Sequence, residues 1–301
     1  MRPFQQQKPP AGGLFVQAWW AMEVAMPFPA VLAPREIPAG SVLLDARPGP
    51  EAFAAGHLPG ALHADLNRCL SLASAPGADP ARGGRHPLPA PAQWAAQLGA
   101  WGITPATPVV AYDDANGGSG AARLWWMLRA FGHARAAVLE GGLQAGLAEG
   151  LAAPGARPGP APPYPGDRWL WPTVTMEETE RLRRDPDWKV LDVRSAPRYR
   201  GETEPIDPVA GHIPGALNRP YPDNLDANGM FKSAATLNAE FASLLAERSP
   251  SEIVHYCGSG VSACHNLLAM ERAGLAGARL YPGSWSEWCA NPLHPVARGD
   301  A

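Results

Sequence analysis

The sequence predicts two tandem α/β domains, each a central, mostly parallel sheet flanked by helices. Three observations lead to this class. Four landmarks recur in the same order at an offset of about 150 residues, which indicates an internal duplication. Short hydrophobic runs alternate with helical patterns, as expected for parallel sheets covered on both faces. The 301 residues are enough for two domains of ordinary size, each with its own core.

The repeated landmarks are short buried strands and tight turns. In the first half they are SVLLDAR (41–47), GHLPGA (56–61), PVVAYDD (108–114) and AAVLEGGLQAG (136–146). In the second half they are KVLDVR (189–194), GHIPGA (211–216), EIVHYCG (252–258) and ARLYPGSWSEW (278–288). Between the third and fourth landmarks each half has leucines at helical spacing and a terminal glycine, in RLWWMLRAFG (123–132) and SACHNLLAMERAG (262–274). We therefore expect the two halves to be built alike.

The join between the halves is a segment rich in proline and glycine, residues 150–167, which cannot support a helix or an inner strand. It places the boundary near residue 160. The predicted division is an N-terminal extension (1–27), a first domain (28–155), a linker (156–170) and a second domain (171–301).

The apolar stretch from Leu14 to Leu32 is interrupted by Glu23, Pro27 and Pro29, so it is too short and too broken to span a membrane. A cleaved signal peptide is the alternative to a plain N-terminal extension.

Charge and cysteine usage exclude several classes of partner. The formal net charge of −3, with 25 Lys and Arg residues, gives no general attraction to nucleic acid or to anionic membranes. The four cysteines form neither a CxxC pair nor a regular disulfide framework. We expect reduced thiols in the cytoplasm, with no metal, no organic cofactor, no nucleic acid and no membrane as a partner.

Cys257 is the candidate nucleophile, because it lies where a strand turns into a helix. The strand 252–256 runs into Cys-Gly-Ser-Gly-Val-Ser (257–262), and a helical pattern follows at once. Glycines let successive backbone N–H groups curve towards one point, and a helix N-terminus adds partial positive charge there. Both effects stabilise a thiolate. A lone cysteine is more often a small buried hydrophobe, and this is our interpretation of Cys69, Cys264 and Cys289.

Together, four motifs resemble the bacterial tandem-domain sulfurtransferases of the rhodanese and mercaptopyruvate sulfurtransferase family, over roughly residues 30 to 297. The motifs are CGSGVSAC (257–264), GHIPGA (211–216), RYRGETEP (198–205) and YPGSWSEW (281–288). The resemblance implies two rhodanese-like domains, of which only the second is catalytic, with the active site in the cleft between them. In the first half Asp113 stands in the place of Cys257, and a carboxylate cannot carry sulfur as a persulfide.

The resemblance also implies roles for individual residues. Cys257 would take sulfur from a small anionic donor as a persulfide and pass it to a thiol, such as that of thioredoxin, or to cyanide. Arg198 would bind the anionic end of the donor, for which a guanidinium offers a fork of fixed donors. Ser259 would move a proton together with His57 of the first half. The backbone of Gly258, Gly260, Val261 and Ser262 would hold the persulfide and the donor.

The donor is predicted from the residues after Cys257. Thiosulfate enzymes of the family usually have cationic residues there, whereas Gly258 and Ser259 make a neutral loop with a serine, which is typical of the mercaptopyruvate branch. The second arginine of that branch, however, falls on Pro205-Ile206-Asp207. We therefore favour 3-mercaptopyruvate, with thiosulfate as the alternative.

Two other functional classes remain as rivals. Phosphatases and arsenate reductases of this fold use Cys-x5-Arg, but the residue six positions after Cys257 is Ala263, which disfavours oxyanion chemistry of that kind. The other rival is a non-enzymatic carrier that accepts a persulfide from another protein. The arginine-containing segment 198–205 argues against it.

Overall fold

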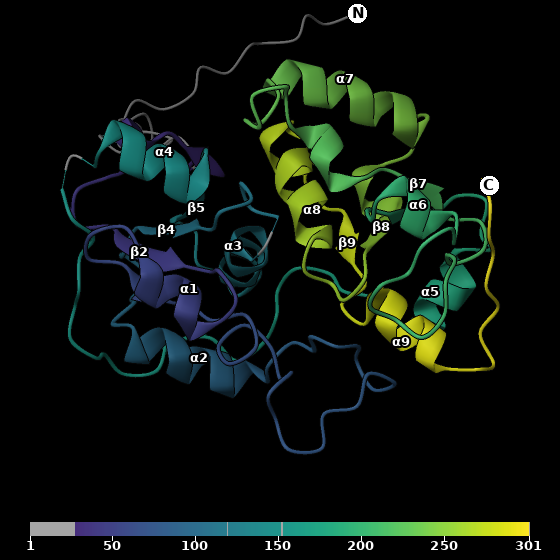
Figure 1. Cartoon of the computed structure of the whole chain (residues 1–301), viewed down its shortest axis with the longest axis horizontal. Helices are drawn as coiled ribbons and strands as arrows, with labels where there is room; N and C mark the ends of the chain where they lie inside the picture. Colours follow the sequence, from purple (N-terminus) through teal and green to yellow (C-terminus); the bar gives the residue numbers. More distant parts are fainter. Residues whose placement is uncertain (1–27, 119, 152, 301) are drawn as a thin grey trace, which may run out of the picture.

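The computed structural model describes residues 28–118, 120–151 and 153–300. The proposed N-terminal extension and its signal-peptide alternative concern residues outside these ranges. The described chain forms two α/β units that lie side by side, each built on a parallel sheet (Figure 1). This confirms the predicted fold class.

The first sheet has the strand order β1-β5-β4-β2-β3, and every adjacent pair is parallel. Its strands are β1 (Val31–Leu32), β2 (Val42–Asp45), β3 (Leu62–His63), β4 (Val109–Tyr112) and β5 (Ala136–Leu139). All residues of β2, β4 and β5 are buried, since helices cover both faces of the sheet.

The second sheet has the order β7-β6-β8-β9 and is also parallel. Its strands are β6 (Lys189–Asp192), β7 (Leu217–Asn218), β8 (Ile253–Tyr256) and β9 (Arg279–Leu280). The two central strands, β6 and β8, are equivalent to β2 and β4 of the first sheet. The repeat seen in the sequence is therefore a repeat of the sheet.

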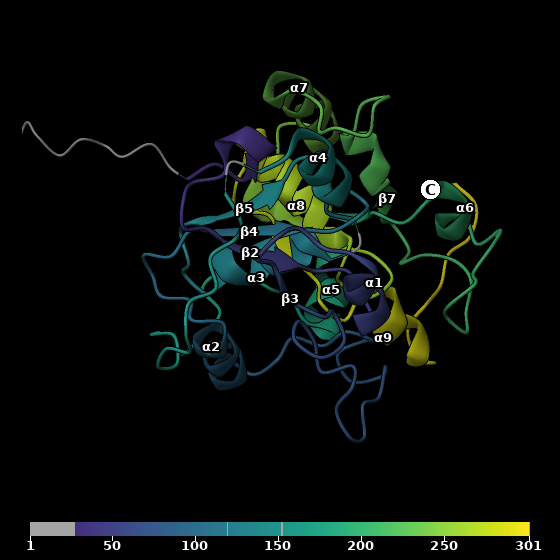
Figure 2. The same ribbon diagram turned by 60° about the vertical axis from the view of Figure 1, so that its left-hand side comes forward.

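The helices connect consecutive strands and cover the sheets (Figure 2). Those of the first unit are α1 (Pro50–Ala55), α2 (Pro91–Ala100), α3 (Ala121–Ala130) and α4 (Gly142–Glu149). Those of the second are α5 (Met176–Leu182), α6 (Ala196–Tyr199), α7 (Ala234–Leu245), α8 (Ala263–Arg272) and α9 (Ser284–Ala290). Short 3-10 helices lie at Pro34–Glu36, Tyr221–Asn224 and Pro250–Glu252.

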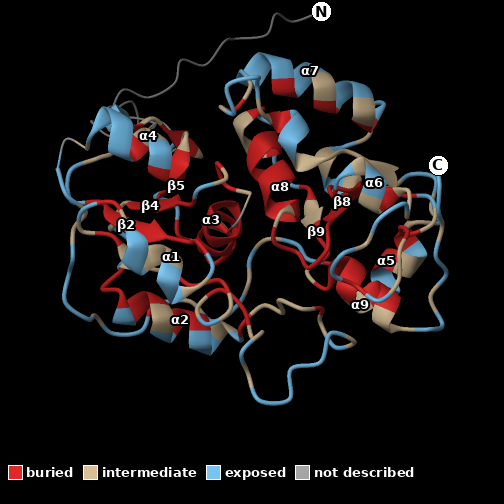
Figure 3. Cartoon of the chain, viewed as in Figure 1, coloured by how far each residue is buried: buried red, intermediate tan, exposed pale blue. Residues whose placement is uncertain are grey.

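Helices α3 and α8 pack against each other and join the two units. Both are buried along almost their whole length (Figure 3). One continuous hydrophobic cluster contains Leu124 and Leu128 of α3 together with Leu267 and Leu268 of α8. Because each helix immediately follows the loop after a central strand, this packing also brings the loops of the two units together.

The chain from α4 to α5 returns along the first unit. The Tyr164 amide donates to the carbonyl of Ala95 in α2 (2.9 Å), and the Trp169 ring packs on Trp126 of α3. Residues 150–175 contain, where they are described, a single β-bridge at Thr173 and neither a helix nor a named strand. The proposed domain limits remain predictions.

In the described part of the chain, no helix is long and apolar enough to cross a membrane.

Candidate active site

Cys257 follows directly after β8, and the loop that it begins leads into α8. Its side chain is buried. Hydrogen bonds hold the loop against the first residues of α9. The Cys257 amide donates to Ser284 Oγ (3.1 Å). The amides of Trp285 and Ser286 donate to the carbonyls of Cys257 (3.0 Å) and Gly258 (2.9 Å). Residues of the YPGSWSEW motif therefore hold the backbone of the cysteine loop in place.

The close contact between the cysteine loop and the segment before α9 requires a glycine at position 260. Its φ angle of +73° lies in the left-handed region, and a Cβ placed on it would lie 2.4 Å from the carbonyl oxygen of Pro282. Any other residue here would push the loop away from that segment.

The amides of the two equivalent loops differ in their acceptors. In the first unit the buried Asp113 carboxylate accepts the amides of Ala115 (3.0 Å), Gly117 (2.8 Å), Gly120 (2.9 Å) and Ala121 (3.0 Å). In the second unit no acceptor among the described residues takes the amides of residues 258–262. The first unit thus carries its own anion at the place that the Cys257 loop occupies in the second.

The other three cysteines are Cys69, Cys264 and Cys289. All four are unpaired, and all lie in the described part of the chain. Burial raises the pKa of Cys264 to about 12 and that of Cys289 to about 11, and it also raises the pKa of Cys69. These three groups are therefore held as thiols, consistent with their interpretation as structural residues.

Ser259 is also buried, and its partner comes from the first unit. His86 Nδ1 lies 2.8 Å from Ser259 Oγ, and His86 Nε2 lies 3.1 Å from Oδ1 of Asn67. Because the Asn67 oxygen only accepts, Nε2 carries the proton and Nδ1 accepts the serine hydroxyl. The backbone N–H of Asn67 donates to Asp65 Oδ1 (2.9 Å), which fixes the position of the residue that orients His86.

His86 is held neutral. Its pKa is lowered to about 4, first by burial and then by the positive charges of Arg123 and Arg85. At neutral pH this imidazole is a proton acceptor for Ser259.

The expectation that His57 would partner Ser259 is wrong, because the histidine beside the serine is His86. His57 stacks on Phe53 (3.9 Å between ring centroids), and its Nδ1 lies 3.0 Å from the Phe53 carbonyl. The second unit repeats this arrangement, with His212 stacked on Tyr199 (3.8 Å) and 2.8 Å from the Tyr199 carbonyl. Because both units share this stacked histidine bonded to a backbone carbonyl, we interpret His57 and His212 as residues that stabilise the His-x-Pro-Gly-Ala turn.

Arg123 of α3 lies beneath the cysteine loop and is fully buried. Its Nη1 donates to the Gly260 carbonyl (2.9 Å), and its Nη2 donates to the His86 carbonyl (3.2 Å). Burial lowers the pKa of this guanidinium, and the nearby Cys264 and Cys257 sulfurs oppose the shift. Arg123 therefore ties the two sides of the site together and places a positive charge under Cys257.

Arg198 lies beside the loop, where the sequence predicted a donor-binding residue. Its guanidinium nitrogens are 3.6 and 3.7 Å from the position that a Cβ on Gly258 would take. Its Nη2 donates to Glu204 (2.7 Å) and lies 3.4 Å from Asp207 Oδ2. Although burial raises the pKa of Glu204, the hydrogen bonds from Arg198 and from backbone amides lower it below its usual value. Asp207 also forms an ion pair with Arg85 of the first unit.

Sequence reasoning did not identify His86, Arg85 or Arg123. His86 and Arg85 lie in a loop of the first unit, and Arg123 begins a helix pattern otherwise rich in tryptophan and leucine. A charged residue on a helix that is buried on all sides is the signal that could have revealed Arg123.

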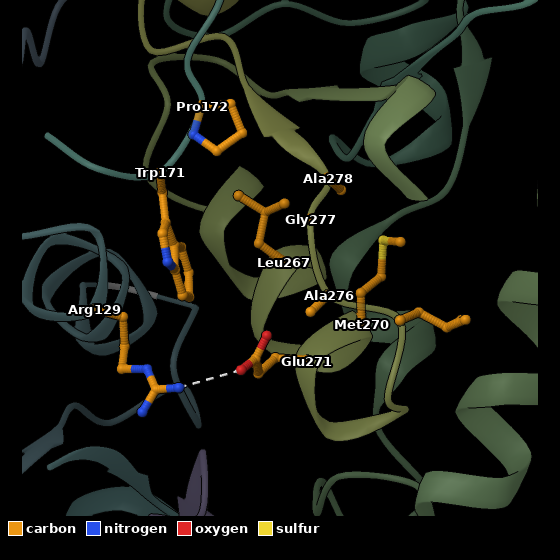
Figure 4. A pocket seen from close by; sticks show the side chains of 10 residues that line it. Arg129, Trp171, Pro172, Leu267, Met270, Glu271, Ala276, Gly277 and Ala278 are labelled. Atoms are coloured by element: carbon orange, nitrogen blue, oxygen red, sulfur yellow. Dashed lines mark hydrogen bonds and ion pairs between the residues drawn. The ribbon is translucent and has the colours of Figure 1, made fainter. Parts of the chain in front are cut away.

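A separate pocket of about 380 Å³ lies at the other end of the interface between α3 and α8, which we call the α3–α8 seam (Figure 4). It is lined by Arg129, Trp171 and Met270 among others, and an ion pair joins Arg129 to Glu271 (3.3 Å). Arg129, Met270 and Glu271 lie near the C-terminal ends of α3 and α8, whereas Cys257 precedes the N-terminus of α8. This pocket is therefore distinct from the candidate site.

Comparisons with known proteins agree with the geometry. The family model described as "Rhodanese-like domain" matches residues 32–149 and 175–291. A probable 3-mercaptopyruvate sulfurtransferase of Pseudomonas aeruginosa is 45% identical over 257 residues, which cover 84% of this chain and 88% of that protein. A putative thiosulfate sulfurtransferase, SseB, of Mycobacterium tuberculosis is 38% identical over 270 residues, covering 86% and 89%.

Among solved structures, 3-mercaptopyruvate sulfurtransferase from Leishmania major superposes with a TM-score of 0.73 and is 31% identical. The match covers 87% of this chain and 74% of that chain.

Proposed function

The chain belongs to the rhodanese family and is a sulfurtransferase, and we propose that it takes sulfur from 3-mercaptopyruvate and carries it as a persulfide on Cys257. The observation that supports this donor best is the pair of Ser259 and His86, two residues after the nucleophile in a loop without cationic side chains. Cleavage of the carbon–sulfur bond leaves pyruvate only when its C3 acquires a proton, and this pair can relay one.

In the first half-reaction the Cys257 thiolate attacks the thiol sulfur of the donor. A sulfur–sulfur bond forms while the bond from that sulfur to C3 breaks, and its electron pair passes into the enolate of pyruvate. The proton that began on the donor thiol moves to C3, which completes pyruvate and leaves a persulfide anion. Ser259 relays this proton, with neutral His86 accepting from its hydroxyl.

The persulfide anion is stabilised by the loop and by the cation beneath it. The amides of residues 258–262, for which no backbone acceptor is found among the described residues, would donate to its outer sulfur. The buried guanidinium of Arg123 offsets the negative charge at Cys257. In the first unit the Asp113 carboxylate occupies the equivalent cradle, which accounts for a single persulfide site.

In the second half-reaction a thiolate or cyanide attacks the outer sulfur. The electron pair of the sulfur–sulfur bond returns to Cys257, and the acceptor leaves as a persulfide or as thiocyanate. The two half-reactions give ping-pong kinetics. A thioredoxin-type dithiol as acceptor and a cytoplasmic location belong to the same proposal, since a reducing compartment keeps the four unpaired cysteines reduced.

Parallel kinetics on two donors test this function. Purified protein is incubated with 3-mercaptopyruvate or with thiosulfate, with an added thiol acceptor, and the release of pyruvate or sulfite is followed. We expect the larger kcat/KM with 3-mercaptopyruvate and no release of either product by Cys257→Ser. A larger kcat/KM with thiosulfate would contradict the proposed donor. Release of neither product by the parent would favour a non-enzymatic persulfide carrier.

A further inference from the structure

We propose that Arg85 of the first unit is a donor-binding residue, which forms with Arg198 a two-arginine clamp for the carboxylate of an α-keto acid donor. This inference rests on the proposed function and deepens it, because it names the groups that recognise the donor. It also gives the unit without a nucleophile a direct part in substrate binding.

The backbone around Arg85 is fixed against the second unit. The Gly83 amide donates to Glu287 Oε1 (2.7 Å), and the Arg85 amide donates to Ser286 Oγ (3.0 Å). Between them, Gly84 has a φ angle of +80°, and a Cβ on it would lie 2.3 Å from the Gly283 carbonyl oxygen. This contact leaves no room for a side chain, so Arg85 is held at a defined place next to the segment that braces Cys257.

The Arg85 side chain reaches the loop itself. Its Nη2 is 3.0 Å from the position of a Cβ on Gly258, closer than either guanidinium nitrogen of Arg198. Two guanidinium groups, one from each unit, thus converge over the residue that follows the nucleophile. The Arg85 side chain is 23% exposed and that of Arg198 is 18% exposed, so both retain a face that is open to a ligand.

Asp207 positions the clamp. Its carboxylate is almost completely buried, with 3% of the side chain exposed, and it pairs with Arg85 through Oδ1 and with Arg198 through Oδ2. A single carboxylate that bridges two guanidiniums fixes their separation and leaves their remaining N–H groups directed elsewhere. Asp207 is therefore a positioning residue rather than a ligand of the donor.

The charges around the clamp favour a singly charged donor. Three arginines, Arg85, Arg194 and Arg198, are paired with three carboxylates, Asp192, Glu204 and Asp207. These three pairs balance in charge, and the buried Arg123 adds one positive charge beneath the cysteine loop. A carboxylate with an adjacent keto oxygen presents acceptors to two forks at once, whereas a doubly charged inorganic anion would need a larger excess of positive charge.

Steady-state kinetics of Arg85→Gln on two donors that differ in one group test the clamp. The donors are 3-mercaptopyruvate and mercaptoacetone, which keeps the keto group and the thiol but lacks the carboxylate. We expect Arg85→Gln to raise KM for 3-mercaptopyruvate about tenfold or more, which is the size of one charge-assisted hydrogen bond, with a smaller change in kcat. KM for mercaptoacetone should change less than about twofold, because no carboxylate is bound.

Arg82→Gln is the matched control. Arg82 lies in the same loop, its side chain is 87% exposed, and its ion pair is with Asp79 of that loop. Its removal takes away an equal charge without touching the cysteine loop, so both KM values should stay at the parent's level. This comparison separates a contact with the donor from a general effect of net charge.

A charge reversal provides a second variant. Arg85→Asp should lose most activity on 3-mercaptopyruvate, because it places a second carboxylate beside Asp207 in place of one guanidinium of the clamp.

An unchanged KM for 3-mercaptopyruvate in Arg85→Gln would overturn the inference while leaving the proposed function intact, provided that the parent releases pyruvate. A fall in kcat that is equal for the two donors, without a change in KM, would also overturn it. That result would mean that Arg85 acts only by supporting the neighbouring His86.

Discussion

His86 Nδ1 of the first unit lies 2.8 Å from Ser259 Oγ of the second, two residues after Cys257. The contact crosses the seam between the units, so the unit without a nucleophile supplies a proton acceptor to the other. Arg123 reinforces the same contact, because it donates to the carbonyls of both Gly260 and His86.

Substitution of His86 tests the proton relay. His86→Gln leaves Ser259 without an imidazole acceptor, so we expect kcat for pyruvate release to fall about a hundredfold or more, with a much smaller change in KM. His57→Gln is the control, because His57 bonds to its own turn, and its kcat should stay within about threefold of the parent. A large loss in the control together with an active His86→Gln would reverse the assignment.

The pH profile should show the low pKa of His86. This pKa is about 4, so the relay is intact at neutral pH and is lost as the pH falls through that value and the imidazole takes up a proton. In Arg85→Gln one of the charges that lowers the pKa is gone, so the acid limb of kcat/KM should move to higher pH. Profiles for both proteins, with folding followed by circular dichroism, measure this shift. An acid limb at the ordinary histidine value in both proteins would contradict the assignment.

Removal of Arg123 tests the buried charge beneath the loop. Arg123→Met leaves two carbonyls without their donor and removes the buried cation beneath the Cys257 loop, so alkylation of Cys257 by iodoacetamide at pH 7 should slow about tenfold or more. Arg129→Met removes a charge from the same helix but from a partly exposed ion pair with Glu271, and should alkylate at the parent's rate. Equal rates in all three proteins would show that Arg123 has no effect on the reactivity of the thiol.

Asp113 should matter for stability and not for chemistry. Asp113→Ala removes the buried acceptor of several amides in the first unit, so we expect the free energy of unfolding to fall by about 3 kcal/mol, with the kcat of the folded enzyme little changed. Asp114→Ala, at the exposed neighbouring position, should cost less than about 1 kcal/mol. Urea unfolding of the two variants measures the difference, and equal costs would show that the carboxylate does not hold this loop.

The parts of the account that sequence could predict are those encoded locally. The strand-to-helix turn at Cys257 depends on residues within one segment, and the duplication on short motifs that recur in both halves, so periodicity and glycine spacing carry this information. The role of Arg198 was implied by the family resemblance of its motif. The interpretation of Asp113 as the silent counterpart of Cys257 followed from the same repeat.

The residues that sequence could not predict act across the seam. The first half has a longer connection than the second: residues 64–90 between β3 and α2, against residues 219–233 between β7 and α7. That connection carries Arg85 and His86. Which side chain meets Ser259 depends on how α3 and α8 pack, and no local pattern encodes this packing. The family resemblance implies His57 of the GHLPGA turn, whereas the structure places His86 beside Ser259.

The most direct test of the central claim is the mass of the protein after reaction with 3-mercaptopyruvate in the absence of an acceptor. We predict that intact-protein mass spectrometry shows the addition of one sulfur atom, that peptide mapping assigns it to Cys257, and that a thiol or cyanide removes it. Sulfur on Cys69, Cys264 or Cys289 instead, or pyruvate release at the parent's rate by Cys257→Ser, would contradict the account.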